Sequence, residues 1–361
     1  MKVAVIGLSG MGQRHLAALE ACNGATQIAG CDIDAAVAAR ARDTHSMAVF
    51  TDLPSLLEDF RPDAAVVVTP PDTHEQIVRD CLLHDVAVLA EKPIATSLVA
   101  CTALVELAAA RGLPFQCGFQ LRYSGLQRAL QHLLESGALG RLTSAVQTQM
   151  SAPIADAHYM SRQRTGGLFY EKLCHHIDFF RLHFGEPQRC MAVAAPNVLA
   201  HYGVHDNVIA VFEFAGGRQG AINFSARRTA HCDAASTPIS GQQAGHFSEF
   251  TFVGDAGSAT FDSLTGQLDV VAYNRRADLQ SERVCTIDVR ASFGEPVYDL
   301  FAQDGDFLSR VGRGIDLRFP ASDALRSMIW AEIAETSLRQ SGAWLTFDAS
   351  ASSASDGAAK G

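Results

Sequence analysis

The sequence predicts a two-domain α/β protein, in which a Rossmann domain with a parallel sheet precedes a domain with a large, mainly antiparallel open sheet. From residue 2 to about 120, short β-rich runs alternate with amphipathic stretches, the rhythm of βαβ units. Longer runs with strand-like alternation begin near residue 142. At 361 residues the chain exceeds what one hydrophobic core usually organises. We therefore expect one domain over residues 1–120 and a second, substrate-binding and oligomerisation domain over 121–348.

In the first domain, β-rich runs of strand length predict a parallel sheet. They cover residues 2–6, 27–32, 64–69, 86–91 and 114–118. Apolar residues recur at helical spacing between them, over 13–21, 35–42, 54–59, 74–84 and 97–111. Each helix can cover one face of the sheet as a right-handed crossover connection.

The second domain is expected to combine strands with three helices. Strand-like alternation covers residues 142–150, 208–214, 220–226, 249–253, 267–273 and 344–347. Helices are expected over 125–137, over 168–184 and over 321–341, the last packing back near the Rossmann domain. Residues 349–361 are small and polar, cannot bury enough apolar surface to order themselves, and are expected to be a disordered tail.

Composition excludes several classes of partner. The formal net charge is −10 and no dense run of Lys or Arg occurs, so nucleic acid is excluded as a partner. The nine cysteines include no C-x-x-C pair, which indicates reduced thiols in a cytoplasmic protein. The apolar start Val3-Ala4-Val5-Ile6 is too short for a signal peptide or a membrane span.

A glycine-rich turn follows the first strand. It reads Gly7-Leu8-Ser9-Gly10-Met11-Gly12, and a helix opens directly after it. Gly7 permits a tight turn, Gly12 permits close helix packing, and the helix N-terminus offers free N–H groups to a pyrophosphate. Ser9 stands where the fingerprint has its middle glycine. Together Gly7, Ser9, Gly10, Met11 and Gly12 are the candidate phosphate-binding turn, although such glycines also occur in ordinary strand–helix connections.

An acidic residue favours the dinucleotide interpretation. Asp32 ends the second strand, 20 residues after Gly12, where a carboxylate can accept hydrogen bonds from the adenosine ribose. Asp34 follows closely, and the adjacent turn contains no Arg to receive a 2′-phosphate. NAD is therefore expected in preference to NADP.

The strand over 86–91 leads into Glu91-Lys92-Pro93, at the carboxyl edge of the sheet where open α/β folds bind ligands. Taken alone, a lysine at a strand end is more often a solvated charge. This motif, the glycine turn and Thr69-Pro70-Pro71-Asp72-Thr73-His74 together resemble the Gfo/Idh/MocA family of oxidoreductases. The resemblance continues through residues 119–123, Gly166-Gly167, His175-His176-Ile177-Asp178 and the motif at 254–258.

The resemblance implies roles for individual residues. Most family members oxidise or reduce a hydroxyl carbon of a sugar, inositol or related polyol, and their open sheet often mediates assembly, here into a homodimer or homotetramer. By resemblance, Thr69, Pro70, His74, Glu91 and Lys92 lie along the bound cofactor. Lys92 also faces the reacting hydroxyl, and His175 is the proton acceptor. Glu171 stands where the family usually has Asp, and Lys172 stands where an apolar residue is more common.

The chemistry of these residues suits alcohol oxidation. That reaction removes a hydroxyl proton while a hydride leaves the same carbon, and a histidine with a pKa near neutrality suits the proton transfer. Glu171 and His175 are four residues apart, so one helical face presents both, and the carboxylate can orient the imidazole. Lys92, near cationic NAD, is expected to have a lowered pKa. The alternatives are a helix-surface pair, and a metal site that also uses Cys174, His176 and Asp178. These side chains point around the helix, so no metal is expected.

Further cations complete the candidate substrate site. Arg122 and Tyr123 follow the last strand of the first domain and could close over cofactor or substrate. Arg162 and Arg164 precede Gly166-Gly167 and could bind an acidic substituent, or equally be solvated surface.

The leading functional hypothesis is an NAD-dependent oxidoreductase acting on a sugar or cyclitol hydroxyl, in either direction. One alternative is an enzyme that recycles bound NAD while cleaving a glycoside by oxidation and elimination. A non-catalytic ligand sensor is a further alternative, against which the presence of both Lys92 and His175 argues.

Overall fold

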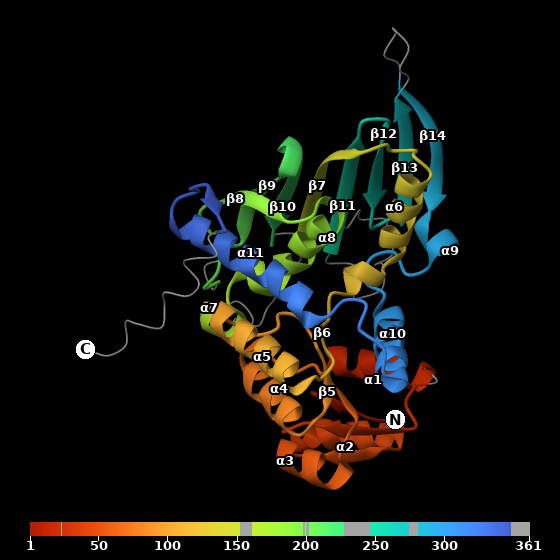
Figure 1. The fold of residues 1–361 in the computed structure, drawn as a ribbon, viewed down its shortest axis with the longest axis vertical. Coiled ribbons are helices and arrows are strands. Elements are labelled where there is room, and N and C mark those ends of the chain that lie inside the picture. Colours follow the sequence, from red (N-terminus) through yellow and green to blue (C-terminus); the bar gives the residue numbers. More distant parts are fainter. Residues whose placement is uncertain are drawn as a thin grey trace, which may run out of the picture.

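A computed structural model describes residues 1–22, 24–151, 161–197, 199, 202–226, 246–273 and 281–347. It contains two sheets, one in each half of the chain (Figure 1). The predicted α/β class, with a parallel sheet followed by a mainly antiparallel one, is confirmed. The predicted tail over 349–361 lies outside the described residues.

The first sheet has six parallel strands in the order β3-β2-β1-β4-β5-β6. They are β1 (Lys2–Ile6), β2 (Gln27–Cys31), β3 (Ala48–Phe50), β4 (Ala64–Val67), β5 (Ala87–Ala90) and β6 (Phe115–Cys117). The connecting helices are α1 (Met11–Ala21), α2 (Ala35–His45), α3 (Leu53–Ser55) with a π-helical turn at Leu56–Phe60, α4 (His74–Leu83) and α5 (Leu98–Arg111). The sequence prediction missed β3, which has only three residues at the edge of the sheet.

The second sheet has nine strands in the order β14-β13-β12-β11-β7-β10-β9-β8-β15. Only β7 and β10 pair in parallel. The strands are β7 (Leu142–Ser151), β8 (Pro187–Ala194), β9 (Asn207–Phe214), β10 (Gln219–Ser225), β11 (His246–Gly254), β12 (Gly257–Asp262), β13 (Gln267–Tyr273), β14 (Ser281–Asp288) and β15 (Leu345–Thr346). The prediction missed β8, β12 and β14. The edge strand β14 reads SERVCTID, whose charged and hydroxyl side chains weaken the apolar alternation.

One face of this sheet is buried and the other is open. The described helices of the second half are α6 (Gly125–Glu135), α7 (Arg162–Thr165), α8 (Cys174–Phe184), α9 (Val289–Phe293), α10 (Leu300–Arg313) and α11 (Ala321–Arg339). On the buried face, Phe179 of α8 packs its ring against Phe250 and Phe252 of β11. The open face exposes apolar side chains of β7 and β9, among them Val146 and Ile209.

Two helices from the C-terminal part return to the Rossmann domain, as the view in Figure 1 shows. Helix α11 packs against α5 and β6, which is the placement predicted for residues 321–341. Helix α10 packs against α1, and its Phe307 and Leu308 share a core with strand β1. The prediction missed α10, because Gly305 and Gly312 lower its helix propensity. No helix in the described part of the chain is both long and apolar enough to cross a membrane.

Candidate active site

The glycine turn has the geometry of a phosphate-binding turn. Gly7 has a φ of 93°, and a Cβ atom there would lie 2.8 Å from the Val68 carbonyl oxygen. A Cβ on Gly12 would collide with the Gly7 carbonyl, so this helix can approach the strand only with glycine. Helix α1 begins at Met11, and Ser9 and Gly10 are exposed in front of it. The N-terminus of α1 is therefore open to an anion.

Asp32 is held at the end of β2 beside this turn. Its Oδ2 accepts the Leu8 N–H at 2.9 Å, and its Oδ1 accepts the Asp34 N–H at 2.9 Å. Asp34 in turn caps α2. Each carboxylate oxygen of Asp32 has a second lone pair, and the side chain is half-buried, so it can still accept a ribose hydroxyl. Together with the glycine turn, these groups fit a dinucleotide.

His74 connects the loops that follow β4 and β5. Its Nδ1 lies 2.8 Å from the Pro93 carbonyl oxygen and its Nε2 lies 2.8 Å from the Thr69 carbonyl oxygen. The ring is buried, and both of its nitrogens have these internal partners. His74 thus holds the two loops together, and its contact with the cofactor stays a prediction. Thr69 and Pro70 lie half-buried in the loop that His74 holds.

Glu91 also has internal partners. Its Oε1 lies 3.1 Å from His15 Nε2 and accepts Gln120 Nε2 at 2.6 Å, while Oε2 accepts the Lys92 N–H at 3.2 Å. The other nitrogen of His15 lies 2.7 Å from Asp304 of α10. Glu91 is buried, so its side chain supports the loop that carries Lys92. Its contact with the cofactor stays a prediction.

These contacts fix the charges of the buried network. Burial alone would lower the pKa of His15, but Asp304 and Glu91 raise it to about 10. Burial alone would raise the pKa of Glu91, but hydrogen bonding and attraction to His15 lower it to about 2. His15 is therefore an imidazolium between two carboxylates, a group that the sequence analysis did not single out.

Lys92 is paired with Glu171 at the carboxyl edge of the sheet. Its Nζ donates to the Glu171 backbone oxygen at 2.6 Å and to Glu171 Oε1 at 3.0 Å. Burial alone would lower the pKa of Lys92, but attraction to Glu171, with smaller contributions from Cys174 and Glu91, raises the pKa above its usual range. The lowering expected from a neighbouring cationic NAD is thus opposed by the Glu171 carboxylate, which holds the proton on the amine.

Glu171 lies within a π-helical turn, Phe169–Leu173, that leads into the helix carrying His175. In a regular α-helix these two positions would share a face, but the wider turn changes their relative direction. Glu171 contacts Lys92 instead, and His175 Nδ1 is buried without a hydrogen-bond partner in the described part of the chain. The expectation that Glu171 orients the His175 ring is therefore wrong.

His175 is buried between aromatic rings. The rings of Phe119 and Tyr298 have their centroids 5.6 Å and 5.4 Å from the His175 ring. Burial, and then repulsion by Lys92, lower the pKa of His175 well below its ordinary value of 6.5. The expected near-neutral pKa is therefore wrong, and the imidazole is uncharged at pH 7. An uncharged imidazole has one nitrogen that can accept a proton.

Tyr298 is a site residue that the sequence analysis missed. It lies between α9 and α10, far along the chain from both Lys92 and His175, and no motif surrounds it. Its ring packs against His175, and burial raises the pKa of its hydroxyl to about 12. It therefore remains a protonated hydroxyl beside the imidazole. Only the folding of the C-terminal part beside α8 brings it there.

Lys172 lies on the same π-helical turn as Glu171. Its Nζ is 3.8 Å from Glu171 Oε2, which is an ion-pair distance but too long for a hydrogen bond. Burial lowers the pKa of Lys172, repulsion by Lys92 adds to this, and attraction to Glu171 only partly offsets it. The predicted substrate residues Lys92, Glu171, Lys172 and His175 thus lie in one region of the fold.

The side chains of Arg122 and Tyr123 contact other residues of the same chain. Arg122 is buried and donates to both oxygens of Asp178, at 2.6 Å and 2.5 Å, and it also pairs with Asp323 of α11. The Tyr123 hydroxyl donates to Asp306 at 3.0 Å. These contacts bind the turn Gln120–Tyr123, which follows β6, to α8, α10 and α11. A contact of this pair with cofactor or substrate stays a prediction.

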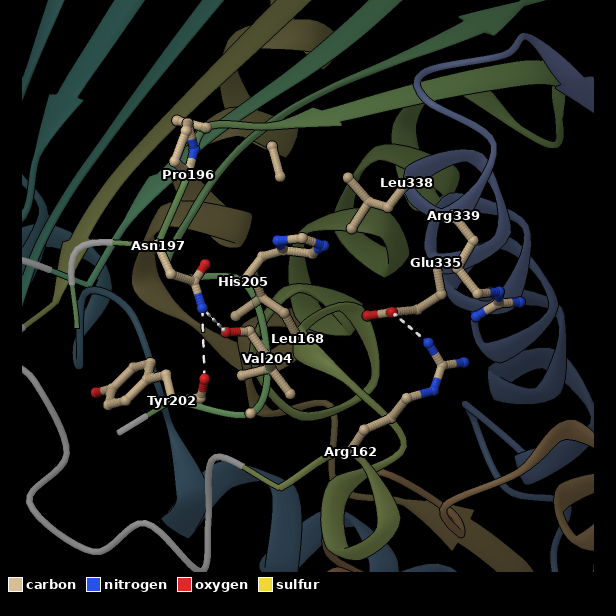
Figure 2. A pocket seen from close by; sticks show the side chains of 13 residues that line it. Arg162, Leu168, Pro196, Asn197, Tyr202, Val204, His205, Glu335, Leu338 and Arg339 are labelled. Atoms are coloured by element: carbon tan, nitrogen blue, oxygen red, sulfur yellow. Dashed lines mark hydrogen bonds and ion pairs between the residues drawn. The ribbon is translucent and has the colours of Figure 1, made fainter. Parts of the chain in front are cut away.

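Arg162 lines a pocket of about 530 Å³ between α11 and the segment that follows β8. Figure 2 shows its side chain directed toward Glu335, and the two form an ion pair of 3.4 Å. The lining of this pocket includes neither Lys92 nor His175, so the structure does not bring Arg162 to them. Arg164 pairs with Asp72 at 2.9 Å and is partly buried.

Comparison with known families shows to which family the chain belongs. Residues 1–119 match the model of an oxidoreductase family with an NAD-binding Rossmann fold, and residues 127–260 match the GFO/IDH/MocA C-terminal domain. The chain belongs to the Gfo/Idh/MocA family. The resemblance seen in the sequence motifs is thus confirmed, and the N-terminal domain is the NAD-binding domain of this family.

The curated proteins that are similar to this chain include inositol 2-dehydrogenases. Inositol 2-dehydrogenase 1 of Mycolicibacterium vanbaalenii is 30% identical over 227 residues, which are 60% of this chain and 63% of the relative. Inositol 2-dehydrogenase 2 of Saccharopolyspora erythraea is 35% identical over 144 residues, 39% of this chain and 42% of the relative. The matches thus span less than two thirds of these relatives.

Solved structures show the same fold over almost the whole chain. A levoglucosan dehydrogenase in complex with NADH matches with a TM-score of 0.79 at 18% identity, covering 96% of this chain and 99% of that one. A putative myo-inositol dehydrogenase from Sinorhizobium meliloti matches with a TM-score of 0.77 at 19% identity, covering 96% and 100%.

Proposed function

We propose that this protein is an NAD-dependent oxidoreductase that transfers a hydride between a hydroxyl carbon of a sugar, cyclitol or related polyol and the nicotinamide. The observation that carries the proposal is the ion pair of Lys92 and Glu171 beside the uncharged His175. This pair lies at the carboxyl edge of the parallel sheet, whose first strand leads into the phosphate-binding turn. The names of the inositol 2-dehydrogenase relatives support the substrate class.

The residues that follow β1 and β2, at the carboxyl edge of the sheet, suit NAD. The N-terminus of α1 would hold the pyrophosphate, with Ser9, Gly10 and Met11 nearest to it. Asp32 would accept hydrogen bonds from the ribose, and its charge disfavours a 2′-phosphate. NADP is therefore the less favoured cofactor.

Each side chain of the site has a separate role in alcohol oxidation. Bound NAD supplies the hydride acceptor. His175, whose imidazole is uncharged, accepts the hydroxyl proton on a ring nitrogen. The Lys92 ammonium faces the negative charge that develops on the substrate oxygen, and it contributes most where water is excluded. Glu171 keeps that ammonium charged and in place.

Incubation of the purified protein with NAD and a panel of sugars, inositols and their acids tests the proposal. We expect NADH absorbance to grow over many turnovers with at least one polyol. Reduction that stops at one equivalent of tightly bound NAD, together with glycoside cleavage, would instead indicate the recycling mechanism. Absence of both reactions across the panel would contradict an enzymatic role on polyols.

The open sheet face supports a homodimer or homotetramer. Val146 and Met150 of β7 and Ile209 of β9 expose apolar side chains there, an arrangement typical of an interface. The mass from light scattering tests this, and a monomer at micromolar concentration would contradict it. The eight cysteines in the described residues are free thiols, which supports a cytoplasmic location.

A further inference from the structure

We propose that the preferred substrate is an acidic polyol, and that Lys172 binds its carboxylate. This inference rests on the proposed dehydrogenase function and specifies its substrate class. It starts from the position of Lys172, which adjoins Glu171 on the π-helical turn and has a side chain only 18% exposed. The carboxylate would belong to the substrate molecule whose hydroxyl lies between Lys92 and His175.

Lys172 has unused hydrogen-bonding capacity. Its ammonium carries three donors, and none of them makes a hydrogen bond to another described residue. The side chain is mostly buried, so water replaces those hydrogen bonds less completely than at an open surface. A buried charge of this kind is costly unless it has a partner.

The nearby carboxylates cannot fully supply that partner. Oε1 of Glu171 accepts a hydrogen bond from Lys92, and Oε2 lies 3.8 Å from Lys172 and has no hydrogen bond. Glu91 accepts hydrogen bonds from its own neighbours and forms no ion pair with either lysine. Among the described residues, Glu171 is therefore the carboxylate that both ammonium groups share at ion-pair distance.

A substrate carboxylate would supply the hydrogen-bond acceptor that Lys172 lacks. It would accept charge-assisted hydrogen bonds from the free donors of Lys172. A neutral polyol would leave those donors without an anionic acceptor at hydrogen-bond distance. The resemblance noted above gives the contrast, because the family more commonly has an apolar residue at the Lys172 position.

The test compares matched substrates, glucose with glucuronate and galactose with galacturonate, using the NAD-loaded enzyme. Each pair differs by one carboxylate in place of a hydroxymethyl group. We expect kcat/KM for the acid to exceed that for the neutral sugar by about 10- to 100-fold, the usual size of a hydrogen bond to a charged group. Lys172→Met keeps the aliphatic stem and should reduce this ratio to near unity.

A matched control distinguishes the effect of Lys172 itself from a general effect of removing one positive charge. Arg164→Gln removes a cation of the same segment that pairs with Asp72 at the surface, and it should leave the acid-to-neutral ratio unchanged. Circular dichroism and NAD affinity confirm that each variant is folded. Calorimetric titration of glucuronate into the protein–NADH complex gives a second readout, in which Lys172→Met should weaken binding by about the same factor.

Equal kcat/KM for acid and neutral sugar, or an unchanged ratio in Lys172→Met, would overturn the inference and leave the dehydrogenase function standing. If no compound in either series reduced NAD, the proposed function would fail instead. The titration would still decide about Lys172, because glucuronate that does not bind, or binds Lys172→Met equally well, overturns its role.

Discussion

Lys92 is the residue whose environment most changes the expected chemistry. A lysine beside a cationic cofactor would lose its proton more easily, but Glu171 raises the pKa of Lys92 above its usual range. Lys92 is therefore a permanent cation and hydrogen-bond donor, and His175 is left as the proton acceptor. This division of roles makes separate predictions for the two residues.

We predict that Lys92→Met lowers kcat by about a hundredfold or more, because a preorganised charge facing the substrate oxygen is lost. The same change leaves Glu171 without its main partner, so thermal stability should fall as well. In the double variant with Glu171→Gln, stability should recover and activity should not. Recovery of activity together with stability would show that the pair is only structural.

For His175→Asn we expect kcat to fall by roughly two to four powers of ten, since the proton acceptor is removed. In the wild-type enzyme the acidic limb of kcat/KM should lie below pH 6.5, because burial lowers the pKa of His175. The matched control is His176→Asn. That ring faces Gln149 of β7, with 2.6 Å between Nε2 and Oε1. Rate–pH profiles of both variants check the assignment, which fails if only the His176 variant is crippled.

Asp32→Asn should lower NAD affinity by about 10- to 100-fold and shift preference toward NADP, because a charged hydrogen-bond acceptor becomes neutral. The variant keeps the shape of the side chain, which also holds the Leu8 N–H. Fluorescence titration with both dinucleotides measures the change. Tighter binding of NADP than of NAD by the wild-type protein would refute the charge argument.

The helix over residues 168–184 differs in one local feature from what the sequence predicts. The apolar spacing over 168–184 predicts a helix, and a helix is present, but its first part is the π-helical turn Phe169–Leu173. A pattern of apolar residues does not report such a local widening, because the same side chains remain buried. The apolar spacing therefore predicts the helix, but it does not predict the relative direction of Glu171 and His175.

Helices α1 and α10 are joined through His15, which supplies a test at this scale. The pKa of His15 is raised from 6.5 to about 10, so its stabilising contribution is complete below pH 6.5 and is lost as the pH rises through about 10. We predict that the difference in free energy of unfolding between wild type and His15→Gln shrinks over this window.

Urea denaturation at several pH values measures that difference. His45→Gln is the control, since His45 Nδ1 also lies 2.7 Å from a carboxylate, that of Glu20, but Glu20 is about half exposed. Its effect should stay small throughout. A His15→Gln effect that does not vary with pH would mean that His15 is uncharged in the folded protein.

Across the whole molecule, the sequence predicts what is encoded locally. The glycine turn, the acidic end of β2 and the lysine after β5 each lie within one βαβ unit, so their places in the sheet follow from chain order. Contacts between distant segments could not be predicted in this way. Tyr298 reaches His175, and Asp304 reaches His15, only because the C-terminal segment returns to the Rossmann domain.

The most direct test of the proposed function follows the hydride itself. A polyol oxidised by the enzyme would be prepared with deuterium on the carbon that bears the reacting hydroxyl and incubated with NAD. The account predicts that mass spectrometry finds one deuterium on the nicotinamide ring of the NADH formed, and that His175→Asn forms this product much more slowly. NADH without deuterium, or oxidation of the polyol with no change in NAD, would contradict direct hydride transfer at this site.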